Sequence, residues 1–61
     1  MIYYVYLGED AQYFTHGRRY PVLDWITGAG ILTSDDDGCD HYISGQYLME
    51  HFAQEENKDA Q

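Results

Sequence analysis

The sequence predicts a mainly β protein, in which one small, strongly curled antiparallel sheet of four to five strands is followed by a short C-terminal helix. Short runs rich in β-branched and aromatic residues recur along the 61-residue chain. Glycine-containing turn signals separate these runs, and the apolar spacing becomes helical near the C-terminus. We expect barrel-like closure of the sheet, because closure hides the strand edges that a small protein would otherwise leave open.

The first expected strand is IYYVYL, residues 2–7, which is apolar on both faces. Pro21 lacks an amide donor, so we expect it at the edge or the start of a strand rather than in a central one. Strict alternation in VLDWI places Leu23 and Trp25 on one face and Val22 on the other. The elements expected before the helix are strands 2–7, 22–26, 31–34 and 39–43, with turns at 8–12, 27–30 and 35–38.

The expected helix occupies residues 44–52. Tyr47, Leu48 and Phe52 recur at helical spacing, and Ser44 is a suitable N-cap. Such a helix would pack Leu48 and Phe52 onto the sheet. No large apolar side chain follows, so we expect one domain over residues 1–52 and a flexible acidic tail over residues 53–61.

Charge narrows the classes of partner. Three Lys and Arg residues face eleven Asp and Glu residues, which gives a net charge of −8. Residues 1–30 contribute −1 (three acids, two bases) and residues 31–61 contribute −7 (eight acids, one base). Direct contact with nucleic acid or with an anionic membrane is disfavoured, whereas a basic protein surface would attract the chain. Solubility alone is a sufficient explanation for any single acidic residue.

Several features favour the cytoplasm. No apolar run is long enough to cross a bilayer, and the first ten residues lack the basic region and cleavage site of a signal peptide. Cys39 is the single cysteine, so no disulfide can form within the chain. These features predict a protein of the reducing cytoplasm.

The segment DDDG, residues 35–38, raises the question of a calcium loop. Such a loop needs glycine at its sixth position and a bidentate glutamate at its twelfth. Counted from Asp35, the sixth residue is Asp40 and the twelfth is Gln46, so the pattern fails. Asp-Gly is a strong hairpin signal, and we therefore predict a turn and no calcium site.

Neither zinc binding nor catalysis has strong support. Cys39, His16, His41 and His51 are permitted zinc ligands, but no C-x-x-C is present and the histidines are scattered. Cys39 and His41 share one face of an expected strand without a third group to orient them, and so short a chain offers little room for a cleft. We expect no metal, no cofactor and no enzymatic activity.

The aromatic content points to a contact surface. Seven tyrosines, one tryptophan and two phenylalanines exceed what a core of this size can hold. Tyr3, Tyr4 and Tyr6 cannot all face inward, because successive side chains of a strand alternate. Two readings stay open: an exposed aromatic patch suited to binding, or tyrosines that fill the core while their hydroxyls reach water.

Residues 14–52 resemble small SH3-like barrel proteins encoded by phages and prophages. The corner is matched by Gly17, Arg19, Tyr20 and Val22, the aspartate-rich turn by Asp36, Asp37 and Gly38, and the closing anchor by Phe52. The resemblance implies an SH3-like fold and a phage or mobile-element origin, and it implies fold more than function.

These observations predict a small cytoplasmic interaction module that binds and inhibits a host protein with a basic surface, such as a nucleic-acid enzyme or a defence nuclease. Its acidic side chains would imitate nucleic acid and its tyrosines would anchor the contact. The expected contact residues are Asp35, Asp36, Asp37, Asp40, Glu50, Tyr3, Tyr4, Tyr6 and Tyr42. The alternative is a homodimer or larger assembly that pairs through the tyrosine-rich N-terminal strand.

Overall fold

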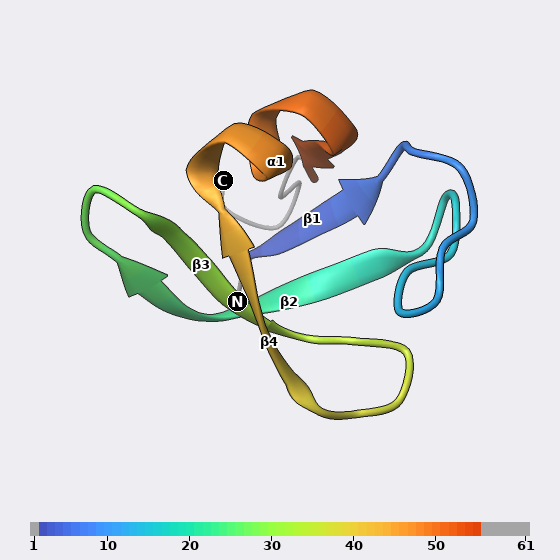
Figure 1. The fold of residues 1–61 in the computed structure, drawn as a ribbon, viewed down its shortest axis with the longest axis horizontal. Coiled ribbons are helices and arrows are strands. Elements are labelled where there is room, and N and C mark those ends of the chain that lie inside the picture. Colours follow the sequence, from blue (N-terminus) through green and yellow to red (C-terminus); the bar gives the residue numbers. More distant parts are fainter. Residues whose placement is uncertain (1, 56–61) are drawn as a thin grey trace, which may run out of the picture.

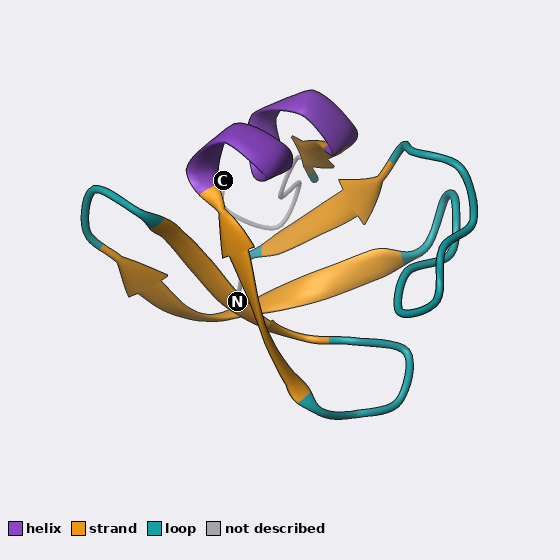
Figure 2. Ribbon diagram, in the orientation of Figure 1, coloured by secondary structure: helices purple, strands orange, loops and turns teal. Residues whose placement is uncertain are grey.

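The structure is a computed structural model that describes residues 2–55. It contains one antiparallel sheet of five strands and one short helix (Figures 1 and 2). The elements are β1 (Tyr3–Tyr6), β2 (Arg19–Ile26), β3 (Gly30–Ser34), β4 (Asp40–Ser44), α1 (Gly45–His51) and β5 (Phe52–Gln54). The strand order is β4-β3-β2-β1-β5. The mainly β prediction is confirmed, but the sheet formed by the described residues is open, with β4 and β5 at its edges, so the expected closure and strong curl are not seen.

The central strand β2 joins the two halves of the sheet. It pairs first with β1, where Tyr20 lies opposite Tyr4, and then with β3, where Trp25 lies opposite Ile31. The register shifts by one residue between Val22 and Asp24, which makes Leu23 the extra residue of a β-bulge. The bulge breaks strict alternation. Val22 and Trp25 therefore lie opposite Thr33 and Ile31, two buried residues on the same face of β3, and the expected separation of Val22 from Trp25 is wrong.

Pro21 lies inside β2, although the sequence predicted an edge or first position for it. The Val22 N–H donates to the Ile2 carbonyl at 2.8 Å, and hydrogen bonds alternate along an antiparallel pair. The nitrogen of Pro21 consequently points away from β1. On its other side, pairing with β3 begins only at Val22, so a central strand tolerates this proline.

Two tight hairpin turns connect the middle strands, as the glycine signals predicted. The Ala29 N–H donates to the Ile26 carbonyl at 2.9 Å, and Gly28 has a φ of 75°. The Gly38 N–H donates to the Asp35 carbonyl at 2.9 Å, and Gly38 has a φ of 79°. Both glycines adopt a left-handed conformation that other residues rarely take.

The helix α1 begins after Ser44, whose hydroxyl accepts a hydrogen bond from the Tyr47 N–H at 3.2 Å. This contact confirms the predicted N-cap. Leu48 is buried, which confirms that the helix packs onto the sheet. Phe52 is also buried, but it is the first residue of β5 rather than the last of the expected helix. With seven residues, α1 is the one helix in residues 2–55, and it is too short to cross a membrane.

The core is small and aromatic. Phe14 reaches it from the loop between β1 and β2, with its ring centroid 5.0 Å from that of Tyr20 and 5.5 Å from that of Phe52. The buried apolar side chains are Tyr6, Phe14, Tyr20, Val22, Ile31, Ile43, Leu48 and Phe52. Removing such a side chain from water contributes about 1.5–3 kcal/mol, so these few residues account for most of the apolar stabilisation.

The strand β5 lies partly where a flexible tail was expected. Phe52 pairs with Tyr6 and Ala53 with Val5, and the Glu55 N–H donates to the Tyr3 carbonyl at 2.9 Å. Paired structure therefore extends to Glu55 rather than ending at residue 52. The rest of the expected tail, residues 56–61, lies outside the described residues.

Candidate interaction face

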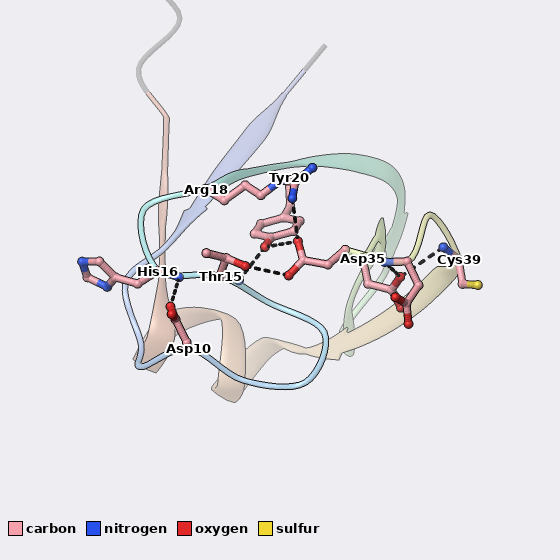
Figure 3. Close-up of polar contacts among 9 residues, drawn as sticks. Asp10, Thr15, His16, Arg18, Tyr20, Asp35 and Cys39 are labelled. Carbon is pink, nitrogen blue, oxygen red and sulfur yellow. Dashed lines mark hydrogen bonds and ion pairs between the residues drawn. The ribbon is translucent and has the colours of Figure 1, made fainter.

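Asp36 joins the β1–β2 loop to the β3–β4 turn. Its carboxylate accepts hydrogen bonds from the Thr15 hydroxyl at 2.8 Å and from the Tyr20 hydroxyl at 2.7 Å (Figure 3). The Arg18 guanidinium lies 3.3 Å from the same carboxylate, and the Asp36 N–H donates to the Tyr13 carbonyl at 2.9 Å. The Tyr20 hydroxyl also accepts from the Thr15 N–H at 2.7 Å, and burial is the main cause that raises the pKa of Tyr20. Asp36 therefore holds two loops together.

Asp35 stabilises the β3–β4 turn from within. One carboxylate oxygen accepts from the backbone N–H groups of Asp37 and Cys39, at 2.9 and 3.1 Å, and the other lies 3.2 Å from the His41 Nδ1. Burial alone would raise the pKa of Asp35. The hydrogen bonds from Cys39, His41 and Asp37 outweigh burial and lower that pKa below its ordinary value. The charged form of Asp35 is thus the one that fits the turn.

These contacts change the predicted acidic surface. The Asp35 side chain is only 3% exposed and that of Asp36 only 18% exposed, so neither offers a free carboxylate to a partner. The prediction that Asp35 and Asp36 contact a partner is therefore corrected, because both carboxylates are occupied by hydrogen bonds within the fold. Asp37, Asp40 and Glu50 are exposed, as expected, although Glu50 accepts a hydrogen bond from Gln46 at 3.2 Å.

Few cations balance the remaining acids. In residues 2–55 the sequence holds nine acidic residues and two arginines, a net charge of −7. Arg18 is paired with Asp36 at 3.3 Å, and Arg19 with Glu55 at 2.9 Å. Arg19 also lies over the Tyr3 ring, 3.9 Å from its centroid. Both arginines are already engaged, so the field around Asp37 and Asp40 is negative.

The pairing register defines an outer face on β2, β3 and β4. Leu32 lies opposite both Asp24 and Tyr42, and Asp40 lies opposite Ser34 on the same side of the sheet. We call Asp24, Leu32, Asp40 and Tyr42 the outer face. Its members are exposed or half-buried, and the Tyr42 residue is 49% exposed. The opposite side of these strands carries the buried residues Ile31, Thr33 and Ile43. The outer face thus combines apolar and acidic groups.

The tyrosines of the predicted contact set occupy different environments. Tyr6 is 3% exposed and donates a hydrogen bond to the Glu9 carbonyl, so it belongs to the core and its predicted contact role is corrected. Tyr4 packs edge-on against Trp25, with ring centroids 6.4 Å apart. Tyr3 is half-buried on the other side of β1. Tyr42 is the exposed member of the set.

The alternative assembly through the N-terminal strand meets a structural obstacle. β1 lies between β2 and β5 and pairs with both. Its backbone groups are therefore occupied on each side. A second copy could pair with β1 only after displacing one of these neighbours, so the geometry does not favour that contact.

Sequence reasoning missed an apolar groove beside the β2–β3 turn. It has a volume of about 300 Å³, and its lining includes Trp25, Ile31 and Leu48. Trp25 is 52% exposed even though it shares a side of the sheet with Ile31. The bulge at Leu23 causes this placement. No signal in the sequence indicated the bulge, because VLDWI alternates regularly and the shift appears only in the pairing of β2 with β3.

Metal binding is not indicated by the geometry. Among residues 2–55, no three side chains of His, Cys, Asp or Glu converge in a way that could hold an ion. Cys39 is a free, exposed thiol. His41 faces Asp35, whereas His16 lies in the β1–β2 loop, where its backbone N–H donates a hydrogen bond to the Asp10 carboxylate at 2.8 Å (Figure 3).

No protein-family model matches the chain, and no curated protein or solved structure shows significant similarity to it. The functional inference therefore rests on the residues and the geometry of the chain itself.

Proposed function

We propose that this chain is an acidic protein-interaction module, encoded by a phage or mobile element, that binds a basic surface of a host protein in the cytoplasm and inhibits it without catalysis. The observation that supports the proposal is the outer face, where Tyr42 and Leu32 lie between the carboxylates of Asp24 and Asp40. Both arginines in residues 2–55 are engaged with acids. The face therefore offers apolar contact area within an uncompensated negative field.

This combination suits a partner that normally binds nucleic acid. A basic groove attracts a negatively charged protein at long range, and complementary charge accelerates association at low salt. An exposed tyrosine adds a large contact area at a small entropic cost. Occupying such a groove would exclude the nucleic acid, which is the proposed route to inhibition.

The fold proposal is an SH3-like small barrel whose edges are left open. Its support is the strand order β4-β3-β2-β1-β5, the long β2 shared by both halves, and the short helix α1 that directly precedes Phe52. Gly17, Arg19 and Tyr20 lie at the entry to β2, where the resemblance places its corner.

Affinity capture with matched baits tests the proposed function. Asp40→Lys should abolish capture of the partner, whereas Glu9→Lys makes the same charge change outside the outer face and should retain most of it. Capture by the native protein should fall as salt rises from about 50 to 300 mM, because salt screens the contact. Duplex DNA should compete for the captured protein. Capture that ignores both salt and the Asp40 substitution would rule out this function.

A further inference from the structure

We propose that the free edge of β4 binds an extended basic segment of the partner, which adds to the sheet as a sixth, antiparallel strand. This inference rests on the proposed function, since it describes how the basic partner is held. The site consists of the outward-pointing backbone groups of Asp40 and Tyr42 together with their side chains on the outer face.

Hydrogen-bond alternation fixes the direction of these backbone groups. The Asp35 N–H donates to the Cys39 carbonyl at 3.0 Å, and the Gly45 N–H donates to the Ala29 carbonyl at 2.6 Å. In an antiparallel pair, opposed residues alternate between hydrogen-bonded and non-hydrogen-bonded pairs. The hydrogen-bonded pairs between these two anchors are therefore Thr33–His41 and Ile31–Ile43. The pairs that do not exchange bonds are Ser34–Asp40, Leu32–Tyr42 and Gly30–Ser44.

It follows that the N–H and C=O groups of Asp40 and Tyr42 point away from β3. Within residues 2–55, β4 pairs with β3 alone and forms one edge of the sheet (Figure 1). Unpaired groups on an exposed edge are a template for another strand, and extended peptides exploit such edges in many complexes.

The side chains along this edge select for charge. In an antiparallel addition, the incoming residues opposite Asp40 and Tyr42 place their side chains on the outer face. A lysine or arginine there meets the Asp40 carboxylate or the exposed Tyr42 ring, which attracts cations through its π face. The residues between them lie on the side of His41 and Ile43, where small or apolar side chains fit. The partner segment should therefore carry basic residues at alternate positions.

Charge disfavours a second copy of this chain as the occupant. Each copy carries a net charge of −8, so two copies repel one another. Asp40 also places a carboxylate on the edge itself, a common protection against self-pairing. The same carboxylate attracts a basic strand.

Two N-methylated peptides give a decisive test. The probe is a synthetic peptide of alternating lysine and valine, whose lysine amides would face β4 in the proposed register. N-methylation of the lysine amides should weaken binding about tenfold or more, because it removes donors to the edge. N-methylation of the valine amides is the matched control and should leave the affinity nearly unchanged. Amide exchange at Asp40 and Tyr42 should slow on binding, while exchange at His41 should not change.

A pair of protein variants tests the same edge from the other side. Tyr42→Pro removes the outward N–H, which an edge strand tolerates, whereas Tyr42→Ala removes the side chain and keeps the N–H. Tyr42→Pro should bind the unmodified peptide several-fold more weakly than Tyr42→Ala. If the proline variant fails to fold, the peptide pair still decides.

The outcomes separate this inference from the proposed function. Equal, salt-sensitive binding of both methylated peptides would overturn strand addition and leave the acidic contact standing. Failure of the unmodified peptide to bind would also overturn strand addition, while the capture experiment would still decide the function. A dimer in sedimentation that Tyr42→Pro dissolves would assign the edge to a second copy and reject the basic segment.

Discussion

Asp36 and Asp37 are neighbours with the same charge and opposite surroundings. Asp36 accepts hydrogen bonds from Thr15 and Tyr20, whereas the exposed Asp37 has no side-chain contact of this kind among the described residues. Asp36→Ala should lower the free energy of unfolding by about 1–3 kcal/mol, because it leaves those hydroxyls and Arg18 without their acceptor. Asp37→Ala should change it by no more than about 0.5 kcal/mol.

Urea unfolding of the two variants measures this difference. The pair is matched, since each substitution removes one negative charge from the same turn. Equal stabilities would mean that the contacts of Asp36 contribute nothing beyond its charge. Greater loss in Asp37→Ala would contradict the assignment of Asp36 as the residue that joins the loops.

The different structural roles of Asp35 and Asp36 could be predicted from the sequence only in part. Asp35 opens a turn that ends at Gly38, and an aspartate at that position commonly accepts the N–H two residues on, so its internal role was accessible. The role of Asp36 depends on Thr15 and Tyr20, which lie 21 and 16 residues away. No local pattern reports a contact of that range.

At the level of elements, Gly30 sets how closely β3 approaches β4. A Cβ on Gly30 would overlap the Ile43 carbonyl oxygen, which is backbone and cannot rotate away. Gly30→Ala should therefore separate the strands at this point and cost about 1–3 kcal/mol in urea unfolding. Gly45→Ala is the control, because its Cβ would lie 3.4 Å from the nearest atom, the Ala29 carbonyl oxygen. If both variants were equally stable, the close approach at Gly30 would be unimportant.

Some secondary-structure elements could be predicted from the sequence and others could not. Two hairpins and the capped helix were predictable, because Gly28, Gly38 and Ser44 act within a few residues of themselves. The strand β5 was not, since its three residues show no alternation and form a strand only by pairing with β1. The bulge at Leu23 was hidden for a similar reason, because register is a property of two strands together.

Across the whole molecule, the negative charge can be explained by the open sheet. An open edge is an aggregation hazard, and like charge on every copy reduces that hazard. The same charge leaves the edge accessible to a strand of opposite sign. A closed sheet would have no free edge and would need no such protection. Closure of the sheet and an excess of acidic residues are therefore two different ways to prevent aggregation at strand edges, and this protein uses the second.

Salt should therefore have opposite effects on stability and on binding. A net charge of −8 on 61 residues repels itself in the folded state, and raising NaCl from about 20 mM to 1 M shortens the screening length to about 3 Å. The thermal midpoint should rise over this range, whereas affinity for a basic partner should fall. Chloride is the suitable anion, because sulfate stabilises proteins by exclusion from their surface.

The double variant Asp37→Lys with Asp40→Lys separates the two effects. It changes the net charge from −8 to about −4 through two exposed positions, so its midpoint should start higher and depend less on salt than that of the native protein. The same variant should lose the salt-sensitive binding. A midpoint that does not respond to NaCl, or that responds equally in both proteins, would show that self-repulsion is negligible.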